Sequence, residues 1–143
     1  MQEIKVLQVG LGPLGVKVAQ FIAERSGISI VAAVDKNPAL IGKKLADLEE
    51  SLSPDITIAG HIKEALAEVA ADVAILTTVS DMERITPQIE EIVSFGLPVV
   101  STCEELSFPK LCAPELTQRI DEAAKANQVA VVGTGVNPGF WMD

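Results

Sequence analysis

Three glycines with a fixed spacing, Gly10, Gly12 and Gly15, directly follow an apolar run near the start of the chain. A G-x-G-x-x-G pattern between a strand and a helix is typical of a dinucleotide site. We expect Gly10 to allow a sharp turn off the strand, Gly12 to leave room for a pyrophosphate and Gly15 to let the helix pack closely. Pro13 suits the first helical position, because its missing N–H costs nothing there, and Leu14 follows it. The free N–H groups and the dipole of this helix start would then attract the pyrophosphate.

An acidic residue directly follows the second apolar run, at the position where a dinucleotide site needs one. The run at residues 28–34 is followed by Asp35, twenty residues after Gly15. Asp35 would accept hydrogen bonds from the adenosine ribose hydroxyls, and its charge disfavours a 2′-phosphate, so we expect NAD rather than NADP. The neighbouring Lys36 could turn toward a phosphate and partly offset that repulsion, which keeps NADP open. The alternative is a glycine turn and a surface aspartate in an α/β domain without a cofactor.

Strand-like apolar runs alternate with helical patterns from one end to the other, which is typical of βαβ units around a parallel sheet. We predict strands at residues 4–9, 28–34, 56–59, 72–77, 98–101 and 129–132, and helices at 13–25, 62–70, 82–95 and 114–127. Residues 37–55 are the least regular and are expected to hold a loop and a short helix at 45–51. Six strands fit one doubly wound parallel sheet over residues 1–143, the Rossmann fold with strand order 3-2-1-4-5-6. The first helix would face this sheet with the apolar residues that recur at helical spacing, Leu14, Val18, Phe21 and Ile22.

Polar residues follow the predicted fourth and fifth strands, and a glycine-rich stretch follows the sixth. In a doubly wound sheet the ligand lies outside the carboxyl ends of the strands. We therefore expect these residues at the same edge as the glycine pattern, with those of the fourth strand near the nicotinamide ribose. The candidates are Thr77, Thr78 and Val79 at the end of the fourth strand and Thr102 and Cys103 after the fifth. The alternative for any one of them is ordinary strand-end and helix-cap chemistry.

The composition limits the classes of partner. The 143 residues include 11 Lys and Arg against 20 Asp and Glu, a net charge of −9, and no basic patch. Nucleic acid and anionic membrane surfaces are therefore not expected as partners. No apolar run approaches the roughly 20 residues of a membrane helix, and because an apolar strand is predicted almost at once we expect no signal peptide. Cys103 and Cys112 are too few for a disulfide framework or a zinc site, so we expect a cytoplasmic protein without a metal.

Three further groups could do chemistry, and each has a simpler interpretation. His61, the one histidine, follows the short third strand and is better interpreted as a helix-start or surface residue than as a general acid or base. Cys103 would be a nucleophile only as a thiolate, which the adjacent Glu104 and Glu105 disfavour, so we expect it to line the cofactor pocket. The two glutamates themselves would either bind a substrate ammonium group or form a solvated loop.

Three segments carry a resemblance to a known family over essentially the whole chain. They are Val9-Gly10-Leu11-Gly12-Pro13-Leu14-Gly15, Ser101-Thr102-Cys103-Glu104-Glu105-Leu106-Ser107-Phe108-Pro109 and Gly133-Thr134-Gly135-Val136-Asn137-Pro138-Gly139-Phe140. The chain resembles the N-terminal domain of the dihydrodipicolinate reductase superfamily and, within it, the 2,4-diaminopentanoate dehydrogenases. The resemblance implies hydride transfer between NAD(P) and a carbon that bears nitrogen. In the diaminopentanoate case an amine is oxidised to an imine, which hydrolyses to a ketone and ammonia.

The resemblance also implies a second domain. Proteins of this family run to more than twice this length, and their second domain supplies the substrate pocket and the proton-transfer groups. We therefore expect the chain to be the N-terminal part of an amino-acid dehydrogenase, able to bind the cofactor but without catalytic residues of its own. Two other functions stay open: an NAD(H)-sensing module that acts through a protein partner, and an S-adenosylmethionine methyltransferase, which also uses a glycine-rich turn and an acid after the second strand. The quaternary state is open too, a homo-oligomer included.

Overall fold

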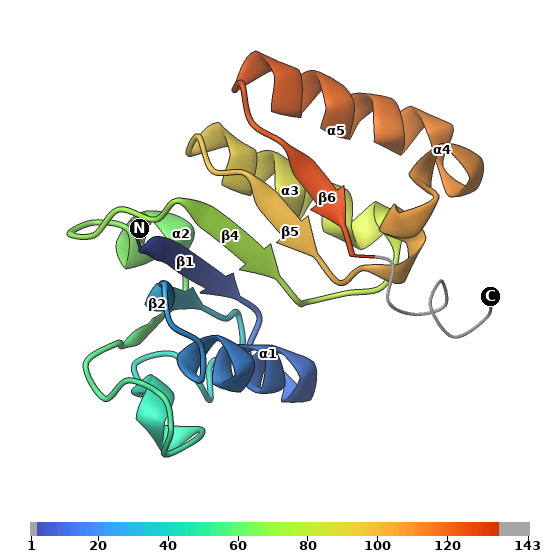
Figure 1. The fold of residues 1–143 in the computed structure, drawn as a ribbon. Coiled ribbons are helices and arrows are strands. Elements are labelled where there is room, and N and C mark those ends of the chain that lie inside the picture. Colours follow the sequence, from blue (N-terminus) through green and yellow to red (C-terminus); the bar gives the residue numbers. More distant parts are fainter. Residues whose placement is uncertain (1–2, 135–143) are drawn as a thin grey trace. The chain divides into compact units, whose positions relative to one another are not determined.

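The computed structural model describes residues 3–134 and contains one six-stranded parallel sheet (Figure 1). Its strand order is β3-β2-β1-β4-β5-β6, so the predicted doubly wound, Rossmann-like α/β fold is confirmed. The chain divides into two compact units, Met1–Thr77 and Thr78–Asp143. Within residues 3–134, no helix is both long enough and apolar enough to cross a membrane.

The first unit contains four of the six strands. Its elements are β1 (Ile4–Val9), α1 (Pro13–Ala23), β2 (Ile28–Val34), the 3₁₀ turn η1 (Leu45–Asp47), β3 (Ile58–Ala59), α2 (Ile62–Ala65) and β4 (Val73–Leu76). β1 lies between β2 and β4, with Val9 opposite the last residue of each. Because the three strands are parallel and in this register, the residues that follow them, Gly10, Asp35 and Thr77, emerge at the same edge of the sheet.

Helix α1 faces the sheet with a different set of residues from the one that its sequence pattern predicts. Leu14 and Phe21 are 54% and 50% exposed, so the expected face is wrong at these two positions. The buried residues of this helix are Gly15, Ala19 and Ile22. Gly15 packs closely on the turn after β1, and the residues four and seven places further on share its face of the helix. The contact of Gly15 with the turn therefore sets the rotation of α1. The Phe21 ring is left exposed, and the ammonium group of Lys17 lies 5.0 Å from its centre.

Three predicted elements of the first unit are reduced to a single turn or to two residues. β3 has two residues, the helix expected at 62–70 is the single turn α2, and the helix expected at 45–51 is the 3₁₀ turn η1. Val69 lies in the part of the predicted helix that follows α2 and is 41% exposed, so a longer helix would bury little apolar surface there. A short helix that buries few apolar side chains is marginal in water, which accounts for its early end.

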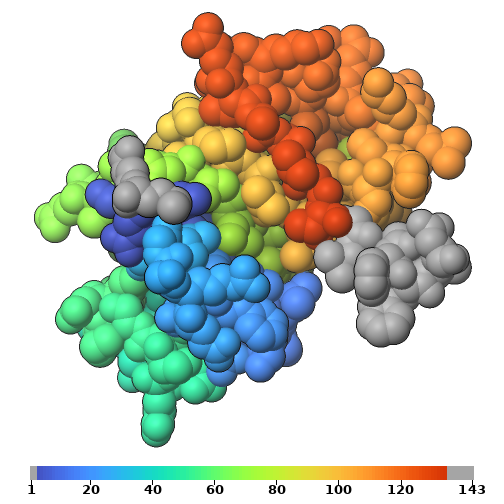
Figure 2. Space-filling model, viewed as in Figure 1, coloured from blue at the N-terminus to red at the C-terminus, as the bar shows by residue number. Residues whose placement is uncertain are grey.

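The second unit packs two longer helices against each other. Its elements are α3 (Met82–Ser94), β5 (Val99–Ser101), the 3₁₀ turn η2 (Glu104–Ser107), α4 (Pro109–Cys112), α5 (Pro114–Ala126) and β6 (Val131–Gly133). Arg119 on α5 donates two hydrogen bonds to the Glu90 carboxylate on α3, at 3.0 and 2.8 Å. η2 and α4 were not expected, because four residues are too few to show a helical period. β6 (red) lies open at the surface in Figure 2, and Val132 on it is 52% exposed.

Candidate dinucleotide site

The turn after β1 requires glycine at its first position. Gly10 has a φ of +94°, in the left-handed region where a side chain would be strained. Its N–H donates to the Val34 carbonyl oxygen (2.9 Å) and continues the pairing of β1 with β2, whereas the next N–H, that of Leu11, donates to a side chain. The expected sharp turn at Gly10 is confirmed.

Helix α1 packs on this turn at Gly15. A Cβ atom at Gly15 would lie 2.0 Å from the Gly10 carbonyl oxygen and 2.8 Å from Thr77 Oγ1. Neither neighbour is the flexible end of a long side chain, so a larger residue would push the helix away from the turn. Gly15 therefore serves close packing, as the pattern predicts.

Gly12 differs from the other two glycines, because no described residue requires it. Its φ and ψ of −67° and −176° suit any residue, and a Cβ atom there would meet no described atom within 4 Å. Gly12 is the N-cap of α1 and provides no side-chain cap, and Pro13 and Leu14 beside it are exposed. The first amides of a helix have no partner within the helix. This end of α1 therefore offers open space and N–H groups, which suit an anion.

A buried polar network beneath the turn was not expected from the sequence. Gln8 donates from Nε2 to the Gly10 carbonyl oxygen (3.0 Å) and to Thr77 Oγ1 (2.9 Å), and the Thr77 hydroxyl donates to the same carbonyl oxygen (2.9 Å). Gln8 is fully buried and Thr77 is 8% exposed, so both side chains are held inside the fold. The hydroxyl of Thr77, which we expected near a ribose, thus supports the glycine turn. An uncharged polar residue in the buried half of an apolar strand was the feature of the sequence that could have revealed Gln8.

Asp35 is held in place by two backbone groups. Its Oδ2 accepts a hydrogen bond from the Leu11 N–H and its Oδ1 accepts one from the Asn37 N–H, both at 2.7 Å. Leu11 lies within the glycine turn, so the carboxylate joins this turn to the loop after β2. Each carboxylate oxygen can accept more than one hydrogen bond, which leaves capacity for ribose hydroxyls. Lys36, the next residue, is exposed.

The predicted site residues of the second unit have varied surroundings. Thr78 is exposed, and its hydroxyl donates to Gln88 Oε1 on α3 (2.7 Å). Val79 and Thr102 are half-buried. Cys103 is 1% exposed, and burial raises the pKa of its thiol. The thiol therefore stays neutral at physiological pH and is not an activated nucleophile.

Two acidic side chains cap helix α3. Glu105 Oε2 accepts from the N–H of Met82 (2.7 Å), and Asp81 Oδ1 accepts from the N–H of Arg84 (2.9 Å). The hydrogen bond from the Arg84 backbone, supported by its guanidinium group, lowers the pKa of Asp81. An ammonium ligand at Glu105 would have to compete with this cap. His61 is the exposed N-cap residue of α2, in agreement with its interpretation as a helix-start residue.

Gly133 brings the second and third segments of the sequence resemblance together. A Cβ atom at Gly133 would lie 2.7 Å from the Leu106 carbonyl oxygen in η2, so the two backbones approach closely. The Thr134 N–H donates to the Ser101 carbonyl oxygen (2.9 Å) and extends the β5–β6 pairing. Residues 135–140 of the third segment lie outside the described residues.

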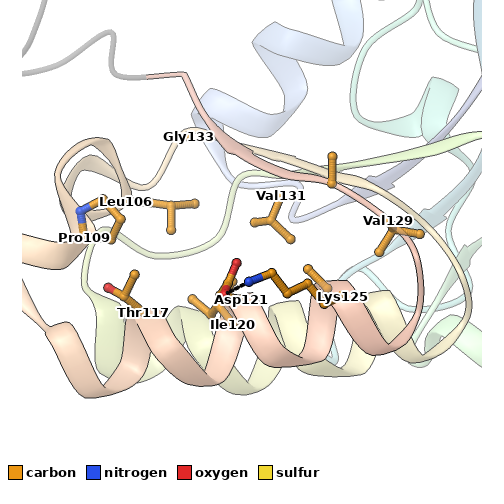
Figure 3. A pocket seen from close by; sticks show the side chains of 11 residues that line it. Leu106, Pro109, Thr117, Ile120, Asp121, Lys125, Val129, Val131 and Gly133 are labelled. Carbon is orange, nitrogen blue, oxygen red and sulfur yellow. Dashed lines mark hydrogen bonds and ion pairs between the residues drawn. The ribbon is translucent and has the colours of Figure 1, made fainter.

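A groove of about 330 Å³ lies elsewhere in the second unit, along α5, β6 and η2 (Figure 3). Its lining is mostly apolar, and the Lys125 ammonium group is paired with the Asp121 carboxylate one turn away on α5 (2.6 Å). None of the predicted site residues is among its lining residues. Residues 3–134 also contain no group of three or more His, Cys, Asp or Glu side chains that could hold a metal ion.

Comparisons with known proteins agree with this geometry. The family model of the CoA binding domain matches residues 1–104. The chain is 35% identical over 145 residues to the 2,4-diaminopentanoate dehydrogenase of Acetoanaerobium sticklandii. The matched region covers 100% of this chain and 41% of that protein. The resemblance carried by the three sequence segments is thereby confirmed, and the chain spans about two fifths of the length of this curated relative.

Solved structures show the same architecture. The amine dehydrogenase from Mycobacterium smegmatis is similar with a TM-score of 0.87 and 25% identity, over 98% of this chain and 41% of that one. The WlbA dehydrogenase from Bordetella pertussis, solved with NADH and UDP-GlcNAcA, has a TM-score of 0.70 and 21% identity, over 93% of this chain and 37% of that one, and shows the fold alone. Because the family model covers most of its length, the chain belongs to the CoA binding domain family.

Proposed function

We propose that the chain is the NAD(P)-binding domain of an oxidoreductase and the first domain of a longer two-domain enzyme. The observation that carries this proposal is the contrast among the three glycines. Gly10 and Gly15 are required by the fold itself, whereas Gly12 opens onto space at the start of α1 that no described atom fills. A glycine that the protein does not need for packing is explained by a ligand that comes close to the backbone.

The residues present fit an adenine dinucleotide. The first amides of α1 would hold the pyrophosphate, and Gly12 would allow its close approach. Asp35 would accept hydrogen bonds from the adenosine ribose hydroxyls, in an orientation that the Leu11 and Asn37 N–H groups already hold. A 2′-phosphate would lie against this carboxylate, so we propose NAD in preference to NADP, with Lys36 as the residue that would offset the repulsion.

Coenzyme A is the second candidate ligand, because the family bears its name. Both ligands contain adenosine and a pyrophosphate, so the same helix end would suit either. Coenzyme A carries a phosphate on the 3′ oxygen of its ribose, where NAD has a hydroxyl group. In the arrangement proposed above, this phosphate would face the Asp35 carboxylate, which favours NAD.

The type of reaction is inferred from the relatives. One is a 2,4-diaminopentanoate dehydrogenase and another is an amine dehydrogenase, so an amine is common to both names. We therefore infer hydride transfer at a C–N centre of an amino acid, for which a bound nicotinamide would supply the hydride acceptor or donor. The substrate pocket and the catalytic residues would come from the remainder of the longer protein.

Four residues of the second unit complete the proposal. Thr78, Val79, Thr102 and Cys103 follow β4 and β5 and remain our candidates for further contacts to the cofactor. Cys103 and Cys112 are both free thiols, which agrees with a reducing compartment. A cytoplasmic location is therefore part of the proposal.

A titration of the chain with NADH, NADPH, coenzyme A and S-adenosylmethionine tests this function. Fluorescence reports the two nicotinamides, and calorimetry reports the other two ligands. We expect saturable binding of NADH that is tighter than that of NADPH. Binding of coenzyme A alone or of S-adenosylmethionine alone would overturn the proposal.

Asp35→Ala tests the proposed ribose contact. Because Asp35 also holds Leu11, its loss should weaken the binding of both nicotinamides, and the ratio of the NADPH Kd to the NADH Kd removes this shared effect. We expect that ratio to fall about tenfold, since one carboxylate no longer repels the 2′-phosphate. Asp47→Ala is the matched control, because the Asp47 carboxylate also accepts a backbone N–H, that of Lys44 (2.8 Å), in the same unit but makes no hydrogen bond to the turn. An equal change of the ratio in both variants would contradict the ribose contact.

A further inference from the structure

One peptide group of the glycine turn, between Gly10 and Leu11, is held on both of its sides. Its carbonyl oxygen accepts hydrogen bonds from Gln8 Nε2 (3.0 Å) and Thr77 Oγ1 (2.9 Å). Its N–H donates to Asp35 Oδ2 (2.7 Å). A rotation of this peptide would break all three hydrogen bonds at once. Side chains from β1, from the end of β4 and from the end of β2 therefore fix its orientation together.

Gln8 reaches this peptide because of its place in the sheet. It lies two residues before Gly10 on β1, so its side chain and the turn are on the same face. Gln8 is opposite Ile75 on β4, which puts Thr77 two residues further along on that face. The glutamine amide can then donate to the Gly10 carbonyl oxygen and to the Thr77 hydroxyl at the same time.

Packing alone would favour an apolar residue in place of Gln8. The other residues in this half of β1 are buried and apolar: Val6, Leu7 and Val9. Gln8 is fully buried, and its Oε1 has no hydrogen-bond partner among the described residues. The Gly10 carbonyl oxygen accepts but cannot donate, so it requires the NH₂ end of the amide and leaves Oε1 on the other side. A buried oxygen without a partner is unfavourable for folding. Stability alone therefore does not explain a glutamine at this position, which indicates that the two hydrogen bonds from Nε2 have a role in function.

We propose that Gln8 is a positioning residue of the dinucleotide site. Its amide group holds the Gly10–Leu11 peptide so that the turn is already formed when the pyrophosphate arrives at the start of α1. The same peptide carries the N–H that orients Asp35, so Gln8 also acts on the ribose side of the site. This inference rests on the proposed function, because it concerns the same cofactor.

Two variants remove a donor to this peptide, and two others serve as controls. Gln8→Met keeps the approximate shape of the side chain but cannot donate, and Thr77→Val removes the hydroxyl that donates from the other side. Thr77→Ser keeps that hydroxyl and should rescue the effect of Thr77→Val. Thr86→Val is the matched control, because Thr86 is also fully buried and donates to the Met82 carbonyl oxygen (2.6 Å), within α3.

Three measurements are made on each variant: the NADH Kd, the hydrogen-exchange rate of the Leu11 amide without nucleotide, and the free energy of unfolding in urea. An apparent Kd rises in proportion to the loss of the binding-competent state, and one hydrogen bond corresponds to about tenfold. We therefore expect Gln8→Met to raise both the Kd and the Leu11 exchange rate about tenfold, with Thr77→Val changing both in the same direction. Thr86→Val should lower the stability but leave the Kd and the Leu11 exchange rate unchanged.

The following outcomes would overturn the positioning role of Gln8 or the proposed function. Wild-type values of Kd and Leu11 exchange in Gln8→Met would overturn the positioning role, as would equal changes in the Thr86→Val control. If Gln8→Met does not fold, the pair Thr77→Val and Thr77→Ser tests the same peptide from the β4 side, and unchanged Leu11 exchange in Thr77→Val would overturn the joint fixing of this peptide by Gln8 and Thr77 on which the proposal rests. If the wild-type chain binds no NADH, the proposed function is overturned, and the Leu11 exchange rate alone shows whether Gln8 fixes this peptide.

Discussion

Alanine at Gly12 and at Gly15 should separate ligand binding from packing within one turn of the same helix. At Gly15 the new Cβ would lie 2.0 Å from the Gly10 carbonyl oxygen, well inside the 3.0 Å that Cβ contacts keep. Overpacking of this kind costs about 1–3 kcal/mol, and alanine in place of glycine within a helix returns about 0.5–1 kcal/mol. Because the clash is with backbone, we expect Gly15→Ala to lower the free energy of unfolding by about 2 kcal/mol, or roughly 6 °C in Tm.

Gly12→Ala should have the opposite pattern. No described atom lies within 4 Å of the new Cβ, and φ and ψ suit alanine. Alanine is a weaker N-cap than glycine by up to about 1 kcal/mol, but it reduces the freedom of the unfolded chain by about 0.4–1 kcal/mol. The Tm should therefore stay within about 2 °C of the wild type. The methyl group would occupy the space that we assign to the pyrophosphate, so the NADH affinity should fall about 100-fold, which corresponds to roughly 2.7 kcal/mol.

Thermal unfolding followed by circular dichroism and NADH titration followed by fluorescence measure the two effects on the same samples. Wild-type NADH affinity in Gly12→Ala would refute the assignment of the open space to a ligand. An unchanged Tm in Gly15→Ala would refute the packing account of α1. If Gly12→Ala lowered the Tm as far as Gly15→Ala, its loss of affinity would be explained by the fold and not by the ligand.

Three further predictions concern the second unit. Gly133→Ala should lower the free energy of unfolding by about 1–2 kcal/mol, because its Cβ would lie 2.7 Å from the Leu106 carbonyl oxygen, and an unchanged midpoint in urea would contradict this. Asp81→Ala should lower the Tm at neutral pH by removing the cap of α3. Since folding lowers the pKa of Asp81, this stabilisation is present above the ordinary pKa of an aspartate and is lost as the pH falls through the lowered value. The Tm difference from the wild type should therefore disappear in acid, and a constant difference between neutral pH and strong acid would argue against the cap. Finally, the exposed Cys112 should react with iodoacetamide near neutral pH while the buried Cys103 does not, and equal labelling of the two in a mass spectrum would contradict the buried, neutral thiol.

The sequence predicted best the features that depend on neighbours along the chain. β1 and β2 have the expected bounds, because each is a mostly apolar run that is followed by a residue with a distinct role, Gly10 or Asp35. The two glycines that the fold requires, Gly10 and Gly15, were assigned to the correct tasks because turn geometry and helix packing follow from their spacing. The strand order followed from the alternation of strands and helices, since parallel strands need crossover connections.

Contacts between distant segments were the part that the sequence did not show. Gln8 and Thr77 are 69 positions apart, and their hydrogen bond depends on the register of β1 and β4. The exposed side chains of Leu14 and Phe21 have a similar cause, because the contact of Gly15 with the turn sets the rotation of α1 and outweighs the burial of two larger side chains. The cap that Glu105 provides for α3 likewise joins residues 23 positions apart.

The Gly10–Leu11 peptide makes the two halves of the proposed cofactor site depend on each other. Asp35 accepts the Leu11 N–H and, in the proposed function, would accept the ribose hydroxyls with the same carboxylate. Recognition of the ribose and order in the pyrophosphate-binding turn are then not independent properties. In the proposed function, a residue at position 35 that tolerates a 2′-phosphate by removing the carboxylate would also remove one of the three hydrogen bonds that hold this peptide. In the proposed function, a change at the neighbouring Lys36, which is exposed and makes none of these three hydrogen bonds, would therefore alter the preference between NAD and NADP with less effect on the turn than a change at Asp35.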